Sequence, residues 1–193
     1  IIGTATISGN NWTYQDSELA DGQTYIYSAR VVNTTNGKSY SSSEITIIVD
    51  TTAPAATTLV QVMDDVGSIT GDIVNNGVTN DTTPTLTGSL TAELATGEFV
   101  QILRGDTVVG TATVTGTGWS FESAALDNGQ TYSFKARVAD TAGNMSAETS
   151  ARSLTVDTTA PAAPTLVQIT DNVGNITGDI VNNGVTNDTT PTL

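Results

Sequence analysis

Catalysis by a nucleophile and an imidazole base is excluded by the composition of this chain. The 193 residues contain no histidine and no cysteine, so neither a Ser-His-Asp nor a Cys-His arrangement can form. The adjacent carboxylates of Asp64 and Asp65 could in principle do acid–base work. However, Asn172 replaces the second of them in a repeated segment, and carboxylates in glycine-rich loops commonly form turns. We therefore do not expect an enzyme.

Calcium binding is the chemistry that the remaining side chains support. Ca²⁺ is bound by carboxylate and carbonyl oxygens from irregular loops. The chain has no Asp-x-Asp-x-Asp-Gly loop and no glycine-rich nonapeptide repeat, so the acidic signal is diffuse. The candidate ligands are Asp50, Asp64, Asp81, Asp140, Asp157, Asp171 and Asp188.

A sequence repeat with a period of 107 residues organises the chain. Residues 50–86 and 157–193 are identical at 32 of 37 positions, and residues 1–49 align without gaps on residues 108–156. A fixed period of this length indicates one folding unit used in succession. We therefore interpret residues 1–49 as the C-terminal part of one unit, 50–156 as a complete unit and 157–193 as the N-terminal part of the next. The chain then represents a window in a longer tandem array.

Charge and composition narrow the classes of partner. The formal net charge is −14, from 6 basic and 20 acidic residues, which disfavours nucleic acid and anionic membrane surfaces. The absence of cysteine excludes disulfides. No apolar run approaches the length of a membrane span, and no signal peptide is recognisable. We expect neither nucleic-acid binding nor membrane insertion.

The alternation of residue types predicts an all-β fold. Tyr132, Phe134, Ala136 and Val138 share one side of a strand whose other side is polar, which is typical of a sheet with one buried face. About seven short strands fit in the complete unit, without a helix long enough for a crossover, which predicts an antiparallel β-sandwich. The predicted core comprises Leu59, Leu86, Val100, Leu103, Trp119, Phe121, Tyr132, Phe134, Ala136, Val138 and Leu154.

Five motifs occur in order along the chain: VDTTAP, TNDTTPTLTG, GWSF, DNGQTYSFKARVAD and DTAGN. In addition, the spacing of Leu126, Gly129 and Tyr132 is that of a tyrosine corner, in which the Tyr hydroxyl bonds to the backbone. Together these motifs resemble the bacterial Ig-like repeats of giant biofilm-associated or type I-secreted (RTX-type) surface adhesins. The resemblance covers all 193 residues. It implies an Ig-like β-sandwich at the bacterial cell surface that extends a ligand-binding tip, often stiffened by calcium at the joints between repeats.

An Ig-type sandwich would gather the acidic candidates at its two ends. Asp50 would enter at one end, near the loop formed by residues 140–144. Asp157 would leave at the other end, near Asp64 and Asp81, which bracket a long polar loop. We therefore expect calcium at both joints, and the family resemblance contributes most to this expectation.

A simpler interpretation of the same residues is that they shape the chain. Asp81 and Asp140 would then close Asx turns, and Asp50 and Asp157 would begin linkers. The first copy also has Asn-Thr-Thr-Asn-Gly at 33–37 where the second has Asp-Thr-Ala-Gly-Asn, which weakens the case for a calcium site in that copy.

Trp12 and Trp119 occupy equivalent positions in the two copies and also allow two interpretations. Exposed, they could stack on a sugar ring. The residues around Trp119 alternate between apolar and polar, which favours a core position. We expect a core tryptophan.

Our interpretation is a structural spacer, or extender, repeat of an extracellular adhesin at the bacterial cell surface, which supports cell adhesion and biofilm formation. Its expected partners are calcium and neighbouring repeats of the same chain, and we do not expect the tip ligand to bind this segment. The alternatives are an Ig-like module that binds a glycan or host protein, and an accessory domain of an extracellular enzyme. The near identity of residues 50–86 and 157–193 favours the spacer, because redundant units need no specialised site.

Overall fold

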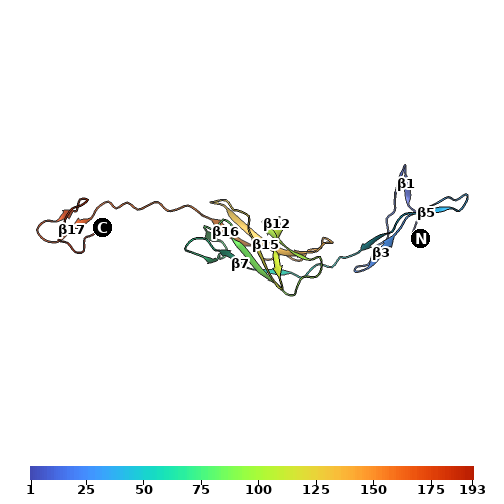
Figure 1. The fold of residues 1–193 in the computed structure, drawn as a ribbon, viewed down its shortest axis with the longest axis horizontal. Coiled ribbons are helices and arrows are strands. Elements are labelled where there is room, and N and C mark those ends of the chain that lie inside the picture. The colour runs from blue at the N-terminus through green and yellow to red at the C-terminus, as the bar shows by residue number, and fades with distance from the viewer. The chain divides into compact units, whose positions relative to one another are not determined.

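The computed structural model describes residues 1–193 as an all-β chain without helices (Figure 1). It forms two compact units, Ile1–Thr158 and Thr159–Leu193. No segment of the chain is a helix capable of crossing a lipid bilayer.

The centre of the first unit is a sandwich of two five-stranded sheets. One sheet has the order β13-β14-β10-β7-β8 and the other has the order β12-β11-β15-β16-β9. All pairs are antiparallel except β9 with β16, which are parallel. The predicted antiparallel β-sandwich is therefore confirmed. The strands are β7 (Thr57–Asp64), β8 (Gly71–Asp72), β9 (Gly77–Thr79), β10 (Thr85–Leu90), β11 (Phe99–Arg104), β12 (Thr107–Thr111), β13 (Thr113–Thr115), β14 (Gly118–Glu122), β15 (Thr131–Ala139) and β16 (Arg152–Val156).

The polar segment between β7 and β10 connects the two sheets. β8 pairs with the end of β7, where Asp64 lies opposite Gly71. β9 then runs parallel to β16, with Thr79 opposite Val156. Because β7 and β9 belong to different sheets, this segment closes one side of the sandwich. It also brings Asp64 close to Thr79, which lies 15 residues later.

The core lies between the two sheets, as the alternation predicts. All of the predicted core residues are buried or pack against the buried cluster, and Leu59, Phe121 and Tyr132 are only partly buried. Trp119 is 3% exposed, which confirms its core position. The tyrosine corner is also confirmed, because the backbone N–H of Asp127 donates to the Tyr132 hydroxyl at 2.9 Å.

Residues 1–49 form only two-stranded sheets, which pair β1 with β2, β3 with β6 and β4 with β5. Trp12, the equivalent of Trp119, is 58% exposed, because this part of the chain lacks counterparts of the strands that cover Trp119. The apolar side chains of this part of the chain therefore do not form a closed core. The strands are β1 (Thr6–Ser8), β2 (Asn11–Thr13), β3 (Thr24–Tyr27), β4 (Arg30–Val32), β5 (Ser39–Ser41) and β6 (Ile45–Ile48).

The second unit, Thr159–Leu193, contains one short antiparallel pair, β17 (Thr170–Asp171) with β18 (Gly178–Asp179). This pair is the counterpart of β7 with β8, with Asp171 opposite Gly178 as Asp64 is opposite Gly71.

Candidate functional site

Two buried aspartates, Asp64 and Asp81, are linked through Thr79. They are 7% and 1% exposed, respectively. The Thr79 hydroxyl donates to Asp64 Oδ2 at 2.5 Å and accepts a 3.0 Å bond from the Asp81 N–H. Asp64 Oδ1 accepts from the Val66 N–H at 2.9 Å, and Asp81 Oδ1 accepts from the Thr83 N–H at 2.7 Å. Both carboxylates therefore close local turns, as the simpler interpretation holds for Asp81.

The second carboxylate oxygen of Asp81, unlike the first, has no hydrogen-bond donor. Asp81 Oδ2 is buried and accepts no hydrogen bond. A buried carboxylate oxygen without a donor or a cation carries a large desolvation cost, so such an atom calls for a physical explanation. An acceptor of this kind fits a bound cation.

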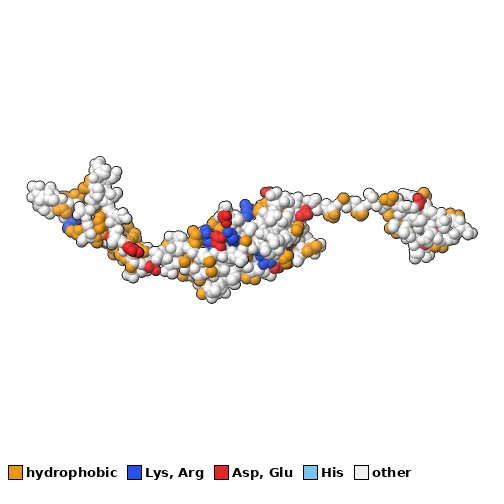
Figure 2. Space-filling view, turned by 180° about the vertical axis from the view of Figure 1, so that it is seen from behind, with side chains coloured by type: hydrophobic (Ala, Val, Ile, Leu, Met, Phe, Trp, Pro, Cys, Tyr) orange, Lys and Arg blue, Asp and Glu red, His pale blue; other side chains and the backbone are white.

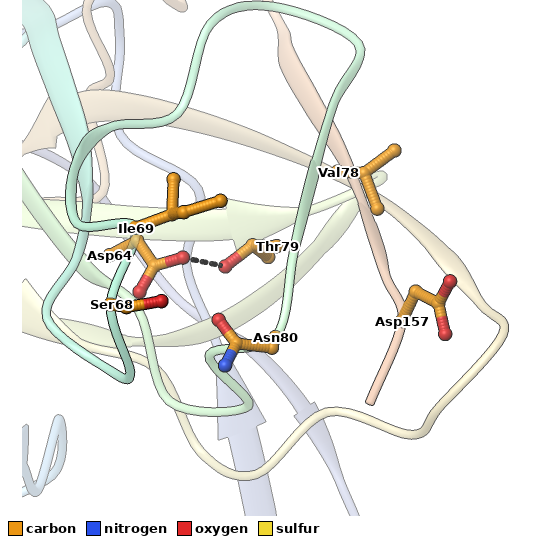
Figure 3. Close-up of a pocket in the computed structure, with 7 residues that line it drawn as sticks. All are labelled: Asp64, Ser68, Ile69, Val78, Thr79, Asn80 and Asp157. Carbon is orange, nitrogen blue, oxygen red and sulfur yellow. Dashed lines mark hydrogen bonds between the residues drawn. The ribbon is translucent and has the colours of Figure 1, made fainter. Parts of the chain in front are cut away.

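A cavity of about 250 Å³ lies at this end of the sandwich (Figure 3). Figure 3 shows the hydrogen-bonded Asp64 and Thr79 on one side and Asp157 on the other. The backbone N–H of Asp157 donates to the Thr79 carbonyl at 2.8 Å, which continues the pairing of β9 with β16. The cavity is lined by Asp64, Ser68, Ile69, Val78, Thr79, Asn80 and Asp157.

The structure thus places Asp64, Asp81 and Asp157 at the same end of the sandwich, as predicted. It does not assemble a complete metal site from side chains, because no group of three or more acidic side chains is arranged to hold a metal ion. Backbone carbonyls, amide oxygens or water would have to supply most of the ligands of a calcium ion here.

At the other end, Asp140 caps the turn that follows β15. Its Oδ1 accepts from the backbone N–H groups of Gly143 and Asn144 at 2.8 and 2.9 Å, and its Oδ2 accepts from Asn144 Nδ2 at 2.9 Å. Partial burial acts to raise the pKa of Asp140, but these hydrogen bonds outweigh it and lower the pKa below the ordinary value. Both carboxylate oxygens of Asp140 therefore hold this turn in place.

Asp50 meets this turn through its backbone. Asn144 Nδ2 donates to the Asp50 carbonyl at 3.0 Å, whereas the Asp50 carboxylate accepts from the Thr52 N–H at 3.0 Å. The predicted proximity of Asp50 to residues 140–144 is therefore observed. The contact uses the amide of Asn144 and does not bring the Asp50 and Asp140 carboxylates together around a shared ligand.

Residues 159–193 build the same acidic network without the rest of a sandwich. The Thr186 hydroxyl donates to Asp171 Oδ2 at 2.6 Å, and Asp188 N–H donates to Thr186 Oγ1 at 2.9 Å. In this copy Asp188 Oδ2 accepts from the Asn172 N–H at 3.2 Å, so this oxygen, unlike Asp81 Oδ2, has a hydrogen-bond donor. The bonds from the Thr190 and Asn172 amides lower the pKa of Asp188. The geometry of this network is therefore encoded by the local sequence.

Sequence reasoning missed two residues that hold the linkers. Asp21 accepts from the Thr51 N–H at 2.6 Å through Oδ1 and from the Thr52 hydroxyl at 2.7 Å through Oδ2. One period later, Asn128 Oδ1 accepts from the Thr158 N–H at 2.8 Å. The signal in the sequence is that both residues begin the DGQTY and NGQTY motifs and both carry a side-chain oxygen.

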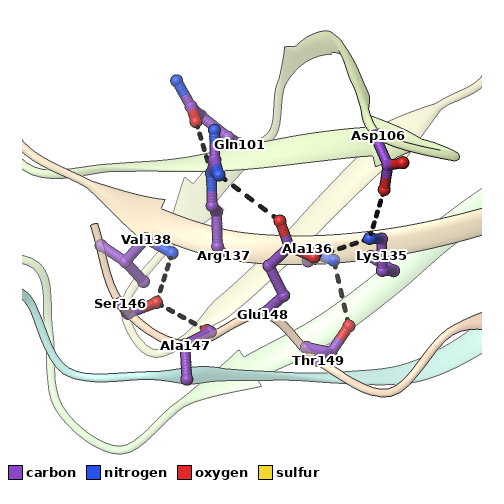
Figure 4. Close-up of polar contacts among 10 residues, drawn as sticks. All are labelled: Gln101, Asp106, Lys135, Ala136, Arg137, Val138, Ser146, Ala147, Glu148 and Thr149. Atoms are coloured by element: carbon purple, nitrogen blue, oxygen red, sulfur yellow. Dashed lines mark hydrogen bonds and ion pairs between the residues drawn. The ribbon is translucent and has the colours of Figure 1, made fainter.

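Basic side chains on β15 are neutralised by neighbours (Figure 4). Lys135 pairs with Asp106 at 3.1 Å and with Glu148 at 2.7 Å. Arg137 pairs with Glu148 at 3.4 Å and donates to Gln101 at 2.9 Å. Figure 2 shows acidic and basic side chains side by side on one face of the sandwich. This face therefore does not present an open basic surface for an anionic partner.

The sequence profile of bacterial Ig-like domains matches residues 56–158, which include every strand of the sandwich. The chain is also similar to Exoglucanase B of Cellulomonas fimi, with 30% identity over 133 aligned residues that cover 66% of this chain. This chain corresponds to only 11% of the length of that exoglucanase.

Proposed function

This chain belongs to the bacterial Ig-like domain family, and we propose that it is a structural spacer of a bacterial cell-surface adhesin. The observation that carries the proposal is the identity of residues 50–86 and 157–193 at 32 of 37 positions, together with the same Asp-Thr-Asp network in both copies. Repeated units of one structure add length, whereas a single specialised site would not need repetition. As a spacer at the cell surface, the chain would support adhesion and biofilm formation by holding a binding tip away from the cell.

The linker between successive units is built to restrict bending. Pro54 restricts Ala53 to extended conformations and is itself buried. Thr51 and Thr52 are hydrogen-bonded to Asp21 of the preceding unit. A linker that is fixed at both ends transmits length more effectively than a flexible Gly/Ser chain.

We propose calcium as the ligand at the end of the sandwich that carries Asp64, Asp81 and Asp157. The support is the buried Asp81 Oδ2, which has no donor, and the cavity at the same end of the sandwich, which Asp64 and Asp157 help to line and Asp81 does not. A cation there would compensate the buried charge of Asp81 next to the start of the following linker. At the opposite end, Asp140 accepts three hydrogen bonds that hold its own turn, and we do not propose a calcium ion there.

In-frame deletion of residues 50–156 from the full-length protein tests the spacer role. We expect the deletion to reduce the distance of the tip from the cell surface, as measured by immunogold labelling, and to reduce adhesion. Binding of the soluble tip to its ligand should be unchanged. Loss of ligand binding by the soluble protein would instead assign these residues to a binding module.

A second candidate, an accessory domain of an extracellular enzyme, is favoured by the similarity to Exoglucanase B. In that case the same deletion would leave hydrolysis of a small soluble substrate unchanged and would slow hydrolysis of an insoluble polysaccharide. A whole protein without any catalytic domain would eliminate this candidate.

A further inference from the structure

One peptide group of the linker is hydrogen-bonded from both directions. The Thr51 N–H donates to Asp21 Oδ1 at 2.6 Å, and the Asp50 carbonyl accepts from Asn144 Nδ2 at 3.0 Å. This N–H and this carbonyl belong to the same planar unit. We propose that the Asp50–Thr51 peptide group is a lock between successive Ig-like units. The preceding unit binds the N–H of this group, and the following unit binds its carbonyl. Its biological use, stiffening a spacer, rests on the function proposed above.

On the preceding side, the fold fixes the position of Asp21. The Gly22 N–H donates to the Val49 carbonyl at 2.8 Å, which ties this turn to the end of β6. The Ala20 N–H donates to the Tyr25 hydroxyl at 2.9 Å, so a tyrosine corner holds the other flank of the turn. The Asp21 carboxylate is thereby presented to the linker, where it accepts from two consecutive threonines.

In the following unit, hydrogen bonds with Asp140 fix the orientation of Asn144. Its backbone N–H and its side-chain amide both donate to Asp140, and its carbonyl accepts from the Asp140 N–H at 3.1 Å. The side-chain amide has two N–H groups, of which one can serve Asp140 and the other the Asp50 carbonyl. Asp140 therefore positions Asn144, which is a role for this carboxylate that needs no cation.

The next linker repeats the bond that the preceding unit makes to the linker backbone. Asn128 accepts from the Thr158 N–H at 2.8 Å, one period after Asp21 and Thr51. The shared feature is a side-chain oxygen at the same position, and the charge differs. The lock therefore depends on hydrogen-bond geometry at the linker backbone, and we expect it to persist when divalent cations are removed.

Amide hydrogen exchange of the full 193-residue chain, measured by NMR in EDTA, tests the bond from the preceding unit to each of the two linkers. Asp21→Ala should accelerate exchange of the Thr51 amide roughly tenfold or more and leave Thr158 unchanged, because the loss of a local bond opens only its own amide. Asn128→Ala is the matched control, and it should accelerate exchange of the Thr158 amide and leave the Thr51 amide unchanged. Asp21→Asn keeps the acceptor and should retain the protection of Thr51.

A distance measurement tests whether the lock restricts bending between residues 1–49 and residues 50–156. The chain has no cysteine, so spin labels can be attached cleanly at Thr35→Cys and Thr117→Cys, both of which are exposed sites. In EDTA, the distance distribution should broaden in Asp21→Ala and in Asn144→Ala, and it should not broaden in Asn128→Ala. Unchanged Thr51 exchange in Asp21→Ala, or an unchanged distribution in both lock variants, would overturn the lock. These results do not depend on whether the deletion experiment supports an adhesin.

Discussion

Trp119 donates its indole N–H to the Thr57 hydroxyl at 2.8 Å, although the two residues are 62 positions apart. This bond joins β14 to the first residue of β7, across β10, and it satisfies the polar atom of a buried ring. The equivalent ring of Trp12 lies in the same kind of short hairpin and is exposed. Whether this tryptophan is a core residue therefore depends on the strands that cover it.

Trp119→Ala should lower the free energy of unfolding by about 3–5 kcal/mol, because it removes a buried aromatic ring and leaves a cavity. Trp12→Ala is the matched control and should change the unfolding free energy by less than about 0.5 kcal/mol. Urea unfolding followed by far-UV circular dichroism gives both values. Equal effects of the two substitutions would contradict the assignment of Trp119 to the core.

Gly88→Ala should destabilise the sandwich by about 1–3 kcal/mol, because a methyl group at this position overpacks the core. The added Cβ would lie 2.0 Å from the Thr58 carbonyl oxygen and 2.2 Å from the nearest Trp119 ring atom. Gly118→Ala, also within a strand, would place its Cβ 3.7 Å from its nearest neighbour and serves as the control. Thermal unfolding of both variants measures the difference, and comparable melting temperatures would show that the ring yields to the extra methyl group.

Calcium should raise the melting temperature of the chain, and Asp81→Asn should abolish this increase. At free calcium about 100-fold above the dissociation constant, the stabilisation would be roughly 2.7 kcal/mol. In EDTA, Asp81→Asn should be no less stable than the parent chain, because it removes a buried charged oxygen without a donor. Asp106→Asn, at an exposed position distant in sequence, is the control. Superimposable melting curves of the parent chain in calcium and in EDTA would refute the calcium proposal.

The contact of Asp21 with the linker should be sensitive to acid. The bond from the Thr51 N–H, followed by that from the Thr52 hydroxyl, lowers the pKa of Asp21 from its ordinary value of 3.8. A lowered folded-state pKa means that the stabilising contribution is fully present above the ordinary value and is lost as pH falls through the folded value. Protection of the Thr51 amide should therefore be complete at pH 4 and fall at lower pH only to the level shown by Asp21→Asn, because the protonated carboxyl keeps one acceptor oxygen. Hydrogen exchange corrected for intrinsic rates measures both levels. Thr158, bonded to the neutral Asn128, should show no such decline.

Much of the local structure could be predicted from the sequence. The alternation of residues 132–138 predicted β15 and its buried face, and the spacing of Leu126, Gly129 and Tyr132 predicted the tyrosine corner. The acidic network is also a local property, because residues 171–190 rebuild the bonds of residues 64–83 with no sandwich around them. Such features depend on neighbours within about 20 residues, so the sequence specifies them directly.

The tertiary structure decided what those local features contact. It left Asp81 Oδ2 without a donor, whereas the equivalent atom of Asp188 accepts from a backbone amide. It also directed Asn144 to the Asp50 carbonyl, 94 residues away. Burial and long-range hydrogen bonds depend on which segments pack together, and the spacing of residues along the chain carries no direct record of that packing. For this reason the acidic ends of the repeat were predictable, while the amide contacts that hold the linker were visible only in the folded chain.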